Sequence, residues 1–199
     1  GMAYQIHIGD ATGDAVVISA GEDGEVKFTR KTVGDGYLIS TNFNLAKPKN
    51  GHHGWRYATA DEALADIMAN NGLNTESAGK VLEDVHLNML TSYTMYSNVF
   101  DLKNKKIYLY YMSQYDEVVV LDLEEELSKG TGELVYMRDL FTEETAAAGD
   151  AAYKKFETRF RIAQAGVILF VLLLLTPLIL FVLRKVQNKR KKNREENLV

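Results

Sequence analysis

The sequence contains no cysteine, and this absence excludes several kinds of site at once. A chain without thiols has no disulfide framework, no sulfur-liganded metal site and no cysteine nucleophile. The motifs of serine hydrolases, phosphate-binding loops, zinc proteases and dinucleotide-binding proteins are also absent. No familiar catalytic signature therefore identifies an activity in these 199 residues.

The chain also lacks a basic pattern outside its C-terminal end. Its formal net charge is −4, whereas the tail from residue 184 onward holds seven basic and two acidic residues. The tail therefore contributes +5, which leaves about −9 for the remaining residues. An acidic domain without a basic stripe argues against nucleic acid as a partner.

Histidines are few, and their positions argue against a metal site. His52 and His53 are adjacent, so both rings cannot easily face one ion, and no carboxylate stands at ligand spacing. His7 and His86 are far away in the sequence. We therefore expect neither a metal ion nor another cofactor in this chain.

What the sequence does have is a long apolar run near its C-terminal end. Residues 165–183 read AGVILFVLLLLTPLILFVL, without a charged residue. A helix of about 20 apolar residues crosses a hydrocarbon core, so we predict a transmembrane helix over residues 164–184. The basic tail of residues 185–199 favours a cytoplasmic C-terminal end and an extracytoplasmic N-terminal domain. The alternative is a tail-anchored protein whose domain lies in the cytosol.

The first forty residues predict an antiparallel meander. Apolar alternation and β-branched residues, separated by turns rich in Gly and Asp, indicate four strands. We place these strands at Tyr4–Ile8, Ala15–Ala20, Glu25–Lys31 and Tyr37–Thr41. The next segment, Asn42–Tyr57, is rich in Asn, Gly and His and is predicted to be a loop.

Two helices and a second group of strands follow. A T-A-D-E capping box predicts a helix from Thr59 to Asn70, and periodic apolar residues predict another from Thr75 to Leu90. A high density of Tyr, Val and Ile then indicates three strands, which are followed by a short helix and a last extended piece. These five elements are Thr94–Asp101, Lys106–Met112, Glu117–Leu121, Leu123–Leu127 and Glu133–Met137.

This order of strands, helices and strands predicts an α+β fold, with helices packed on an antiparallel sheet. The composition divides the chain into four parts. They are an α+β domain of residues 1–140, a helical stalk of residues 141–163, the transmembrane helix of residues 164–184 and the basic tail of residues 185–199.

Asn42 and Arg56 are the candidates for a catalytic role. Asn42 follows a predicted strand, and a rigidly held amide at such a place can donate a hydrogen bond to a developing oxyanion. Arg56 presents a planar fork of donors that suits a carboxylate or a carbonyl. Asn and Arg at loop ends also make ordinary turn and surface contacts, and that interpretation stays open.

The order of several segments resembles the later half of a known enzyme family. These segments read GDATGDAVVIS, LISTNFN, GWRY and YTMYSNVFDLKNKKIYLY, and the resemblance covers roughly Tyr4 to Leu127. They are similar to the linear amide C–N hydrolases, which include choloylglycine hydrolases, penicillin V acylases and related acyltransferases. The resemblance implies an N-terminal-nucleophile hydrolase, with an αββα sandwich, that acts on N-acyl amide small molecules.

The resemblance also implies roles for the two candidate residues. Asn42 matches the Asn of the family's T-N motif, which helps to form the oxyanion hole, and Arg56 is the best match for a pocket Arg. The family's nucleophilic Cys, and the Arg and Asp of its first strands, have no counterpart here. We expect them to lie upstream, in an N-terminal fragment that bears the nucleophile, so that this chain alone is inactive. The alternative is a non-catalytic, membrane-tethered ectodomain of the same fold that binds a ligand or a partner.

Overall fold

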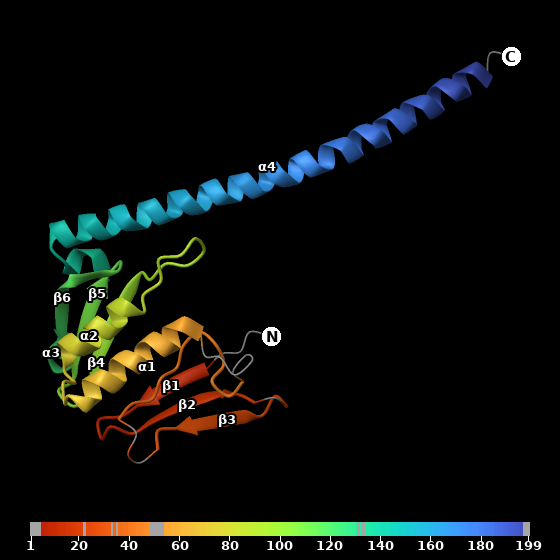
Figure 1. The fold of residues 1–199 in the computed structure, drawn as a ribbon. Helices are drawn as coiled ribbons and strands as arrows, with labels where there is room; N and C mark the ends of the chain where they lie inside the picture. The colour runs from red at the N-terminus through yellow and green to blue at the C-terminus, as the bar shows by residue number, and fades with distance from the viewer. Residues whose placement is uncertain are drawn as a thin grey trace. The chain divides into compact units, whose positions relative to one another are not determined.

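The computed structural model describes residues 5–21, 23–32, 34, 36–47, 54–130, 132 and 134–196. The chain divides into two compact units, residues 1–153 and residues 154–199. The first unit holds two three-stranded antiparallel sheets with helices, and the second is the greater part of one long helix (Figure 1). The α+β class expected from the sequence is confirmed, with two small sheets in place of one.

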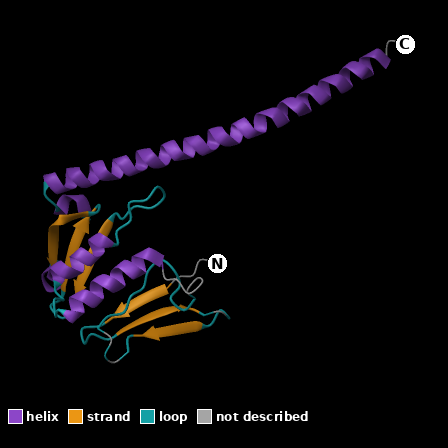
Figure 2. Cartoon of the chain, viewed as in Figure 1, coloured by secondary structure: helices purple, strands orange, loops and turns teal. Residues whose placement is uncertain are grey.

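The first sheet is built from β1 (Gln5–Gly9), β2 (Ala15–Ala20) and β3 (Val26–Arg30), in that order (Figure 2). Both strand pairs are antiparallel. Asp10 Oδ1 accepts the backbone N–H of Thr12 at 2.8 Å and so organises the first turn. Three of the four strands predicted for this region are therefore confirmed.

The two faces of this sheet differ in their surroundings. The register places Ile6, Ile18 and Phe28 side by side on one face, and Val17 on the other. Val17 is fully buried, whereas Ile6 and Phe28 are each 60% exposed. A sheet normally buries an apolar face against another layer. Here an outer apolar face stays open to solvent. It comprises the exposed Ile6, Ile8, Val26 and Phe28 and the half-buried Val16 and Ile18.

The segment Tyr37–Thr41 is not a strand, so the fourth predicted strand is wrong. Gln5 Nε2 donates to the backbone oxygens of Thr41 and Phe43, at 2.5 Å and 2.6 Å. Ile39 meanwhile packs against the helices in a buried cluster. The Gln5 side-chain amide thus takes the place of a neighbouring strand as the hydrogen-bond partner of these two carbonyl groups. The segment therefore forms no backbone pairing with the sheet.

Helix α1 (Gly54–Ala69) begins five residues before the predicted capping box. The T-A-D-E segment therefore lies inside the helix, and the loop prediction is wrong at Gly54–Tyr57. Residues 48–53 of the predicted loop lie outside the described residues. Tertiary packing accounts for the difference, because α1 contributes to a core cluster made of Ile39, Ala60, Val81 and Val85.

Helix α2 (Thr75–Asp84) begins where the sequence predicts it. The Asn74 side chain caps it by accepting the Ser77 backbone N–H at 2.8 Å, in a capping box. The helix ends six residues before the predicted end. The reason is a competing chain reversal, in which Thr94 Oγ1 accepts the N–H of Leu87 and the Thr94 N–H donates to the Leu87 carbonyl, both at 2.8 Å.

The second sheet is formed by β4 (Tyr96–Asp101), β5 (Lys106–Tyr111) and β6 (Gln114–Asp122), in that order. All pairs are antiparallel, and the three strands predicted here are confirmed. Asp101 Oδ1 accepts the backbone N–H of Asn104 at 3.0 Å in the predicted turn between β4 and β5.

Two short helical segments follow β6. They are α3 (Leu123–Ser128), which agrees with the predicted short helix, and the 3-10 helix η1 (Met137–Leu140). Met137 is therefore helical, so the extended piece predicted over Glu133–Met137 is wrong at its last residue. Glu133 lies outside the described residues.

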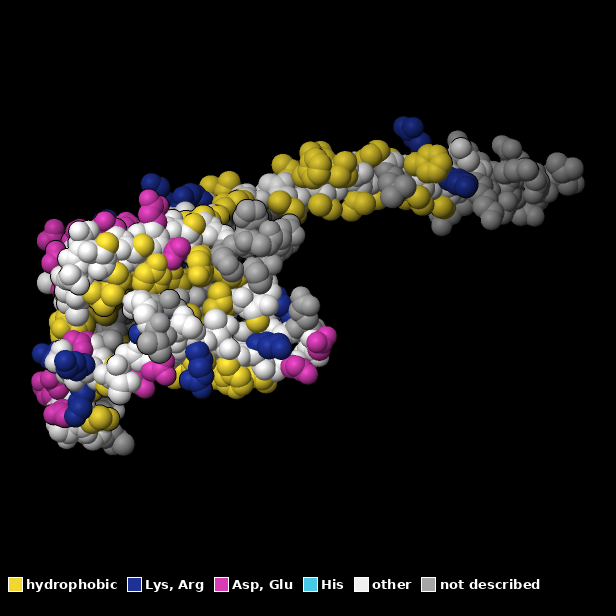
Figure 3. All heavy atoms as spheres, turned by 60° about the horizontal axis from the view of Figure 1, so that its bottom comes forward, with side chains coloured by type: hydrophobic (Ala, Val, Ile, Leu, Met, Phe, Trp, Pro, Cys, Tyr) yellow, Lys and Arg dark blue, Asp and Glu magenta, His cyan; other side chains and the backbone are white. Residues whose placement is uncertain are grey.

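Helix α4 (Glu143–Glu196) is continuous and passes through Pro177. Its first turns pack within the first unit, where Ala146 is only 1% exposed and Tyr153 joins the cluster around Leu109 and Phe141. In the second unit, α4 carries a segment long and apolar enough to cross a membrane. Hydrophobic side chains cover this segment in Figure 3, and they are exposed. Length and composition therefore support a membrane-spanning helix.

Candidate functional site

Asn42 lies on a loop that hydrogen bonds to the first sheet hold in place. Asn44 Nδ2 donates to the Ala20 carbonyl at 2.7 Å, and the Leu45 N–H donates to Gln5 Oε1 at 3.1 Å. The Asn42 side chain itself is exposed. Asn42 is thus presented from an anchored loop next to β1 and β2, and not from the end of a strand.

A histidine and a serine meet beside this loop. His7 Nδ1 lies 2.9 Å from Ser40 Oγ, although the two residues are 33 positions apart. Burial lowers the pKa of His7 from its ordinary value of 6.5, which favours the neutral imidazole at pH 7. A neutral imidazole beside a hydroxyl is the pairing that activates a nucleophile. The described residues include no further hydrogen-bond partner for His7, so no triad is formed.

Sequence reasoning treated His7 only as a distant histidine and did not consider Ser40. The contact depends on the position of the 37–41 segment relative to β1, which no local pattern encodes. The available signal was the alternation of β1, because it places His7 on the same face as Gln5.

Two buried hydroxyl groups near the loop have no hydrogen-bond partner within the described part of the chain. They are Ser19 Oγ and Thr41 Oγ1. Ser19 pairs with Gln5 in the register of the first sheet, so their side chains share one face. Gln5 Nε2 donates to the Thr41 carbonyl, which places Thr41 and the Asn42 loop at the same face. Both hydroxyl groups therefore lie on the side of the sheet that holds this loop. An unsatisfied buried polar group costs about 1–3 kcal/mol, and such groups in native proteins call for an explanation.

Arg56 has a structural role in this conformation. Its Nε donates to the Val85 carbonyl at 2.8 Å, which ties the first turn of α1 to the C-terminal end of α2. Burial raises the pKa of Tyr115, and the positive charge of Arg56 offsets part of this rise. Arg56 is half-buried and faces the helix end and Tyr115.

The structure therefore gives Asn42 and Arg56 different neighbours. Asn42 belongs to the loop beside His7 and Ser40, whereas Arg56 contacts the end of α2. Among the described residues, no hydrogen bond, ion pair or ring contact joins the two side chains.

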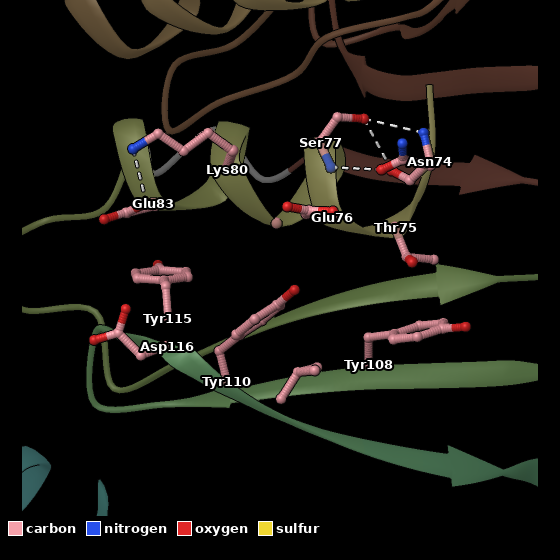
Figure 4. A pocket seen from close by; sticks show the side chains of 12 residues that line it. Asn74, Thr75, Glu76, Ser77, Lys80, Glu83, Tyr108, Tyr110, Tyr115 and Asp116 are labelled. Carbon is pink, nitrogen blue, oxygen red and sulfur yellow. Dashed lines mark hydrogen bonds and ion pairs between the residues drawn. The ribbon is translucent and has the colours of Figure 1, made fainter. Parts of the chain in front are cut away.

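A separate cavity of about 640 Å³ opens between α2 and the strands β5 and β6 (Figure 4). Neither Asn42 nor Arg56 lines it. Its wall on the strand side carries the aromatic groups together with Asp116, whereas its wall on the helix side carries the other charged groups. These residues include Tyr108, Tyr110 and Tyr115 from the strands, and Glu76, Lys80 and Glu83 from the helix.

No group of three or more His, Asp or Glu residues suited to a metal ion occurs in the part of the chain that the structure describes. His52 and His53 lie outside that part.

Comparisons of the chain with protein-family models, curated proteins and solved structures found no significant match.

Proposed function

We propose that this chain is the C-terminal part of a membrane-anchored hydrolase or acyltransferase that acts on the linear C–N bond of N-acyl amides. Its nucleophile comes from a second polypeptide segment, upstream of Gly1 or in another chain, because the sequence contains no cysteine. The resemblance of the segments around Asn42 and Arg56 to the linear amide hydrolases supports this assignment.

One structural observation carries the proposal. The outer apolar face of the first sheet exposes large side chains, among them Ile6 at 60% and Val26 at 62%. Layered folds bury such a face against another layer. An additional sheet that packs there would complete an αββα sandwich, the architecture that the resemblance implies. Because Gln5 holds the Asn42 loop on the opposite face of the first sheet, the nucleophile of this additional segment must reach past the edge strand β1 to meet Asn42.

In this proposal Asn42 stabilises the reaction's charged intermediate. A thiolate from the second segment attacks the amide carbonyl, the carbonyl oxygen becomes negative, and the Asn42 amide donates a hydrogen bond to it. The anchoring of the loop by Gln5 and Asn44 holds the donor in place before reaction. Arg56 acts as a positioning residue, since it holds the end of α2 through the Val85 carbonyl.

The test is to co-express the full chain with the segment encoded directly ahead of it and to assay the purified complex. Substrates are penicillin V, a conjugated bile salt and an N-acyl homoserine lactone. We expect turnover by the complex and none by the chain alone. The variant Asn42→Ala lowers kcat by about 100-fold or more, whereas Asn70→Ala, an exposed Asn at the end of α1, leaves kcat unchanged. A well-folded complex without turnover contradicts the proposal.

A second candidate is a non-catalytic, membrane-tethered domain that binds a partner through the same face. The hydrogen bond from Arg56 to the Val85 carbonyl favours this non-catalytic candidate, because the Arg56 side chain already has a structural partner. The experiment above separates the two candidates, since this one predicts a stable complex in which no substrate is turned over. For both candidates we place the first unit on the extracytoplasmic side, on the basis of the basic tail.

A further inference from the structure

The cavity between α2 and the second sheet has a rigid aromatic wall. Tyr110 and Tyr115 lie with their ring centroids 5.2 Å apart. The Tyr115 hydroxyl is held by Ser97 Oγ at 2.8 Å and by the Leu82 carbonyl at 3.2 Å. Tyr108 stands on the same face of β5 as Tyr110, two residues away. Three tyrosine side chains thus line one side of the cavity (Figure 4).

One of these phenols has an unused polar group. Tyr110 is only 6% exposed, yet its hydroxyl makes no hydrogen bond to any described residue. Figure 4 shows its ring directed from β5 toward α2, with the hydroxyl near Glu76. Burial raises the pKa of Tyr110, and the nearby negative charge of Glu76 raises it further. The phenol is therefore neutral at pH 7 and free to accept a hydrogen bond from a ligand.

The charged groups of the cavity leave a negative excess. Among the described residues of the lining, Lys80 is the basic one, and its Nζ is paired with Glu83 at 2.8 Å and with Asp84 at 3.2 Å. Glu76 on α2 and Asp116 on β6 have no ion-pair partner among the described residues. Both walls of the cavity therefore present an uncompensated carboxylate.

We propose that this cavity binds a small organic ammonium cation. The aromatic faces attract a cation through the ring quadrupole, the carboxylates of Glu76 and Asp116 supply the opposite charge, and Tyr110 Oη accepts an N–H from the ammonium. An anion of the same size meets two unpaired carboxylates and is repelled. A neutral alcohol makes the hydrogen bond but gains neither of the charge interactions. This site is independent of the amide hydrolase proposal, because neither Asn42 nor Arg56 belongs to it.

The experiment uses the full chain in nanodiscs of zwitterionic lipid, which have no net charge to attract a cation. Three probes of equal chain length are titrated by calorimetry, with empty nanodiscs as the reference: n-butylammonium, 1-butanol and butyrate. We expect n-butylammonium to bind at least about tenfold more tightly than 1-butanol, and butyrate to show no binding. Equal or tighter binding of butyrate overturns the proposal.

Variants then locate the site. Glu76→Gln and Asp116→Asn act from opposite walls, and each weakens n-butylammonium binding by about tenfold. Tyr110→Phe keeps the ring and weakens binding about three- to tenfold through loss of the acceptor. The matched control is Glu62→Gln, which removes the same charge from the exposed surface of α1. We expect this variant to bind n-butylammonium with unchanged affinity. If Glu62→Gln weakens binding as much as Glu76→Gln does, the effect is general electrostatics and the cavity is not the site.

Discussion

Tyr111 donates a hydrogen bond of 2.8 Å from its hydroxyl to Asp150 Oδ1, and so joins the end of β5 to the first turns of α4. Arg138 Nε donates to the other oxygen, Asp150 Oδ2, at 2.9 Å. One carboxylate therefore connects the second sheet, the segment η1 and the long helix. Gly149, the neighbour of Asp150, allows this approach, because a Cβ there would lie 2.8 Å from Met112 Cβ and 2.9 Å from a ring carbon of Tyr111.

The variant Asp150→Asn is expected to lower the thermal midpoint of the first unit at pH 7. The hydrogen bond from Arg138, followed by the one from Tyr111, lowers the pKa of Asp150 below its ordinary value of 3.8. A lowered pKa adds stability above about pH 3.8, and this stability is lost as the pH falls through the lowered value. Melting curves of both proteins should therefore converge in strong acid. The control is Asp139→Asn, which changes a nearby exposed carboxylate. An equal fall in the thermal midpoint of this variant would contradict the stabilising role of Asp150.

At alkaline pH the same contact acts through Tyr111. Burial, together with the hydrogen bond to Asp150, raises the pKa of Tyr111 from 10.0 to about 12. The unfolded phenol ionises first, so the free energy of unfolding falls as the pH rises from 10 toward 12. The variant Tyr111→Phe should remove the part of this pH dependence of the free energy of unfolding that the Tyr111 phenol contributes. Tyrosinate absorbance during an alkaline titration of both proteins gives the pKa of Tyr111, because the difference between the two curves is the contribution of this phenol. A pKa near 10 for Tyr111 would refute the prediction.

Gly79→Ala is expected to destabilise the first unit although it improves helix propensity. Alanine in a helix gains about 1 kcal/mol over glycine. The new Cβ, however, would overlap Tyr110 Oη and lie 2.9 Å from Tyr110 Cζ. Overpacking of a buried side chain typically costs about 1–3 kcal/mol, so we expect a net loss of about 1 kcal/mol in urea denaturation. Because Tyr110→Phe removes the overlapping oxygen, the double variant should recover part of the loss. A Gly79→Ala protein more stable than wild type would show that Tyr110 moves freely.

Phe28→Lys is expected to reduce self-association without unfolding the domain. Phe28 lies on the outer apolar face, and a surface substitution there changes the free energy of unfolding by about 0.5 kcal/mol or less. In a version cut before Ala163, sedimentation velocity should show wild type associating and Phe28→Lys more monomeric. Val17→Lys, on the buried face of the same sheet, should instead unfold it. A wild-type protein that is a clean monomer would contradict this prediction.

The basic tail is expected to set the orientation in the membrane. Replacing Arg190, Lys191, Lys192 and Arg194 by Glu removes most of the positive charge that keeps this end cytoplasmic. In sealed vesicles, protease accessibility of the N-terminal domain should then change for part of the molecules. Exchange of Lys for Arg and Arg for Lys at the same four positions keeps the charge and should keep the orientation. Equal accessibility in all three proteins would favour the tail-anchored alternative.

Much of the strand pattern was predictable because its signals are local. Alternation and turn residues act over a few positions, and β1, β2 and β3 appear close to the predicted places. Tyr37–Thr41 has similar composition but forms no strand, since a strand needs a backbone partner and Gln5 bonds the carbonyls of Thr41 and Phe43 instead.

The candidate site was less predictable, since its chemistry depends on distant pairs. Asn42 was found from its position after an apolar segment, and it does lie on an anchored loop. The contact of His7 with Ser40 could not be read from either residue's neighbourhood. A catalytic role for Asn42 and Arg56 stays a prediction.

The sequence by itself determined that the chain carries an apolar helix of membrane-spanning length and an α+β domain, because composition and periodicity act along the chain without reference to distant residues. Only the tertiary structure decided that Arg56 serves the Val85 carbonyl, that Tyr110 reaches Gly79, and that the first sheet leaves Phe28 exposed. These outcomes depend on which elements pack together, and packing is set by the summed burial of many side chains that are distant in sequence.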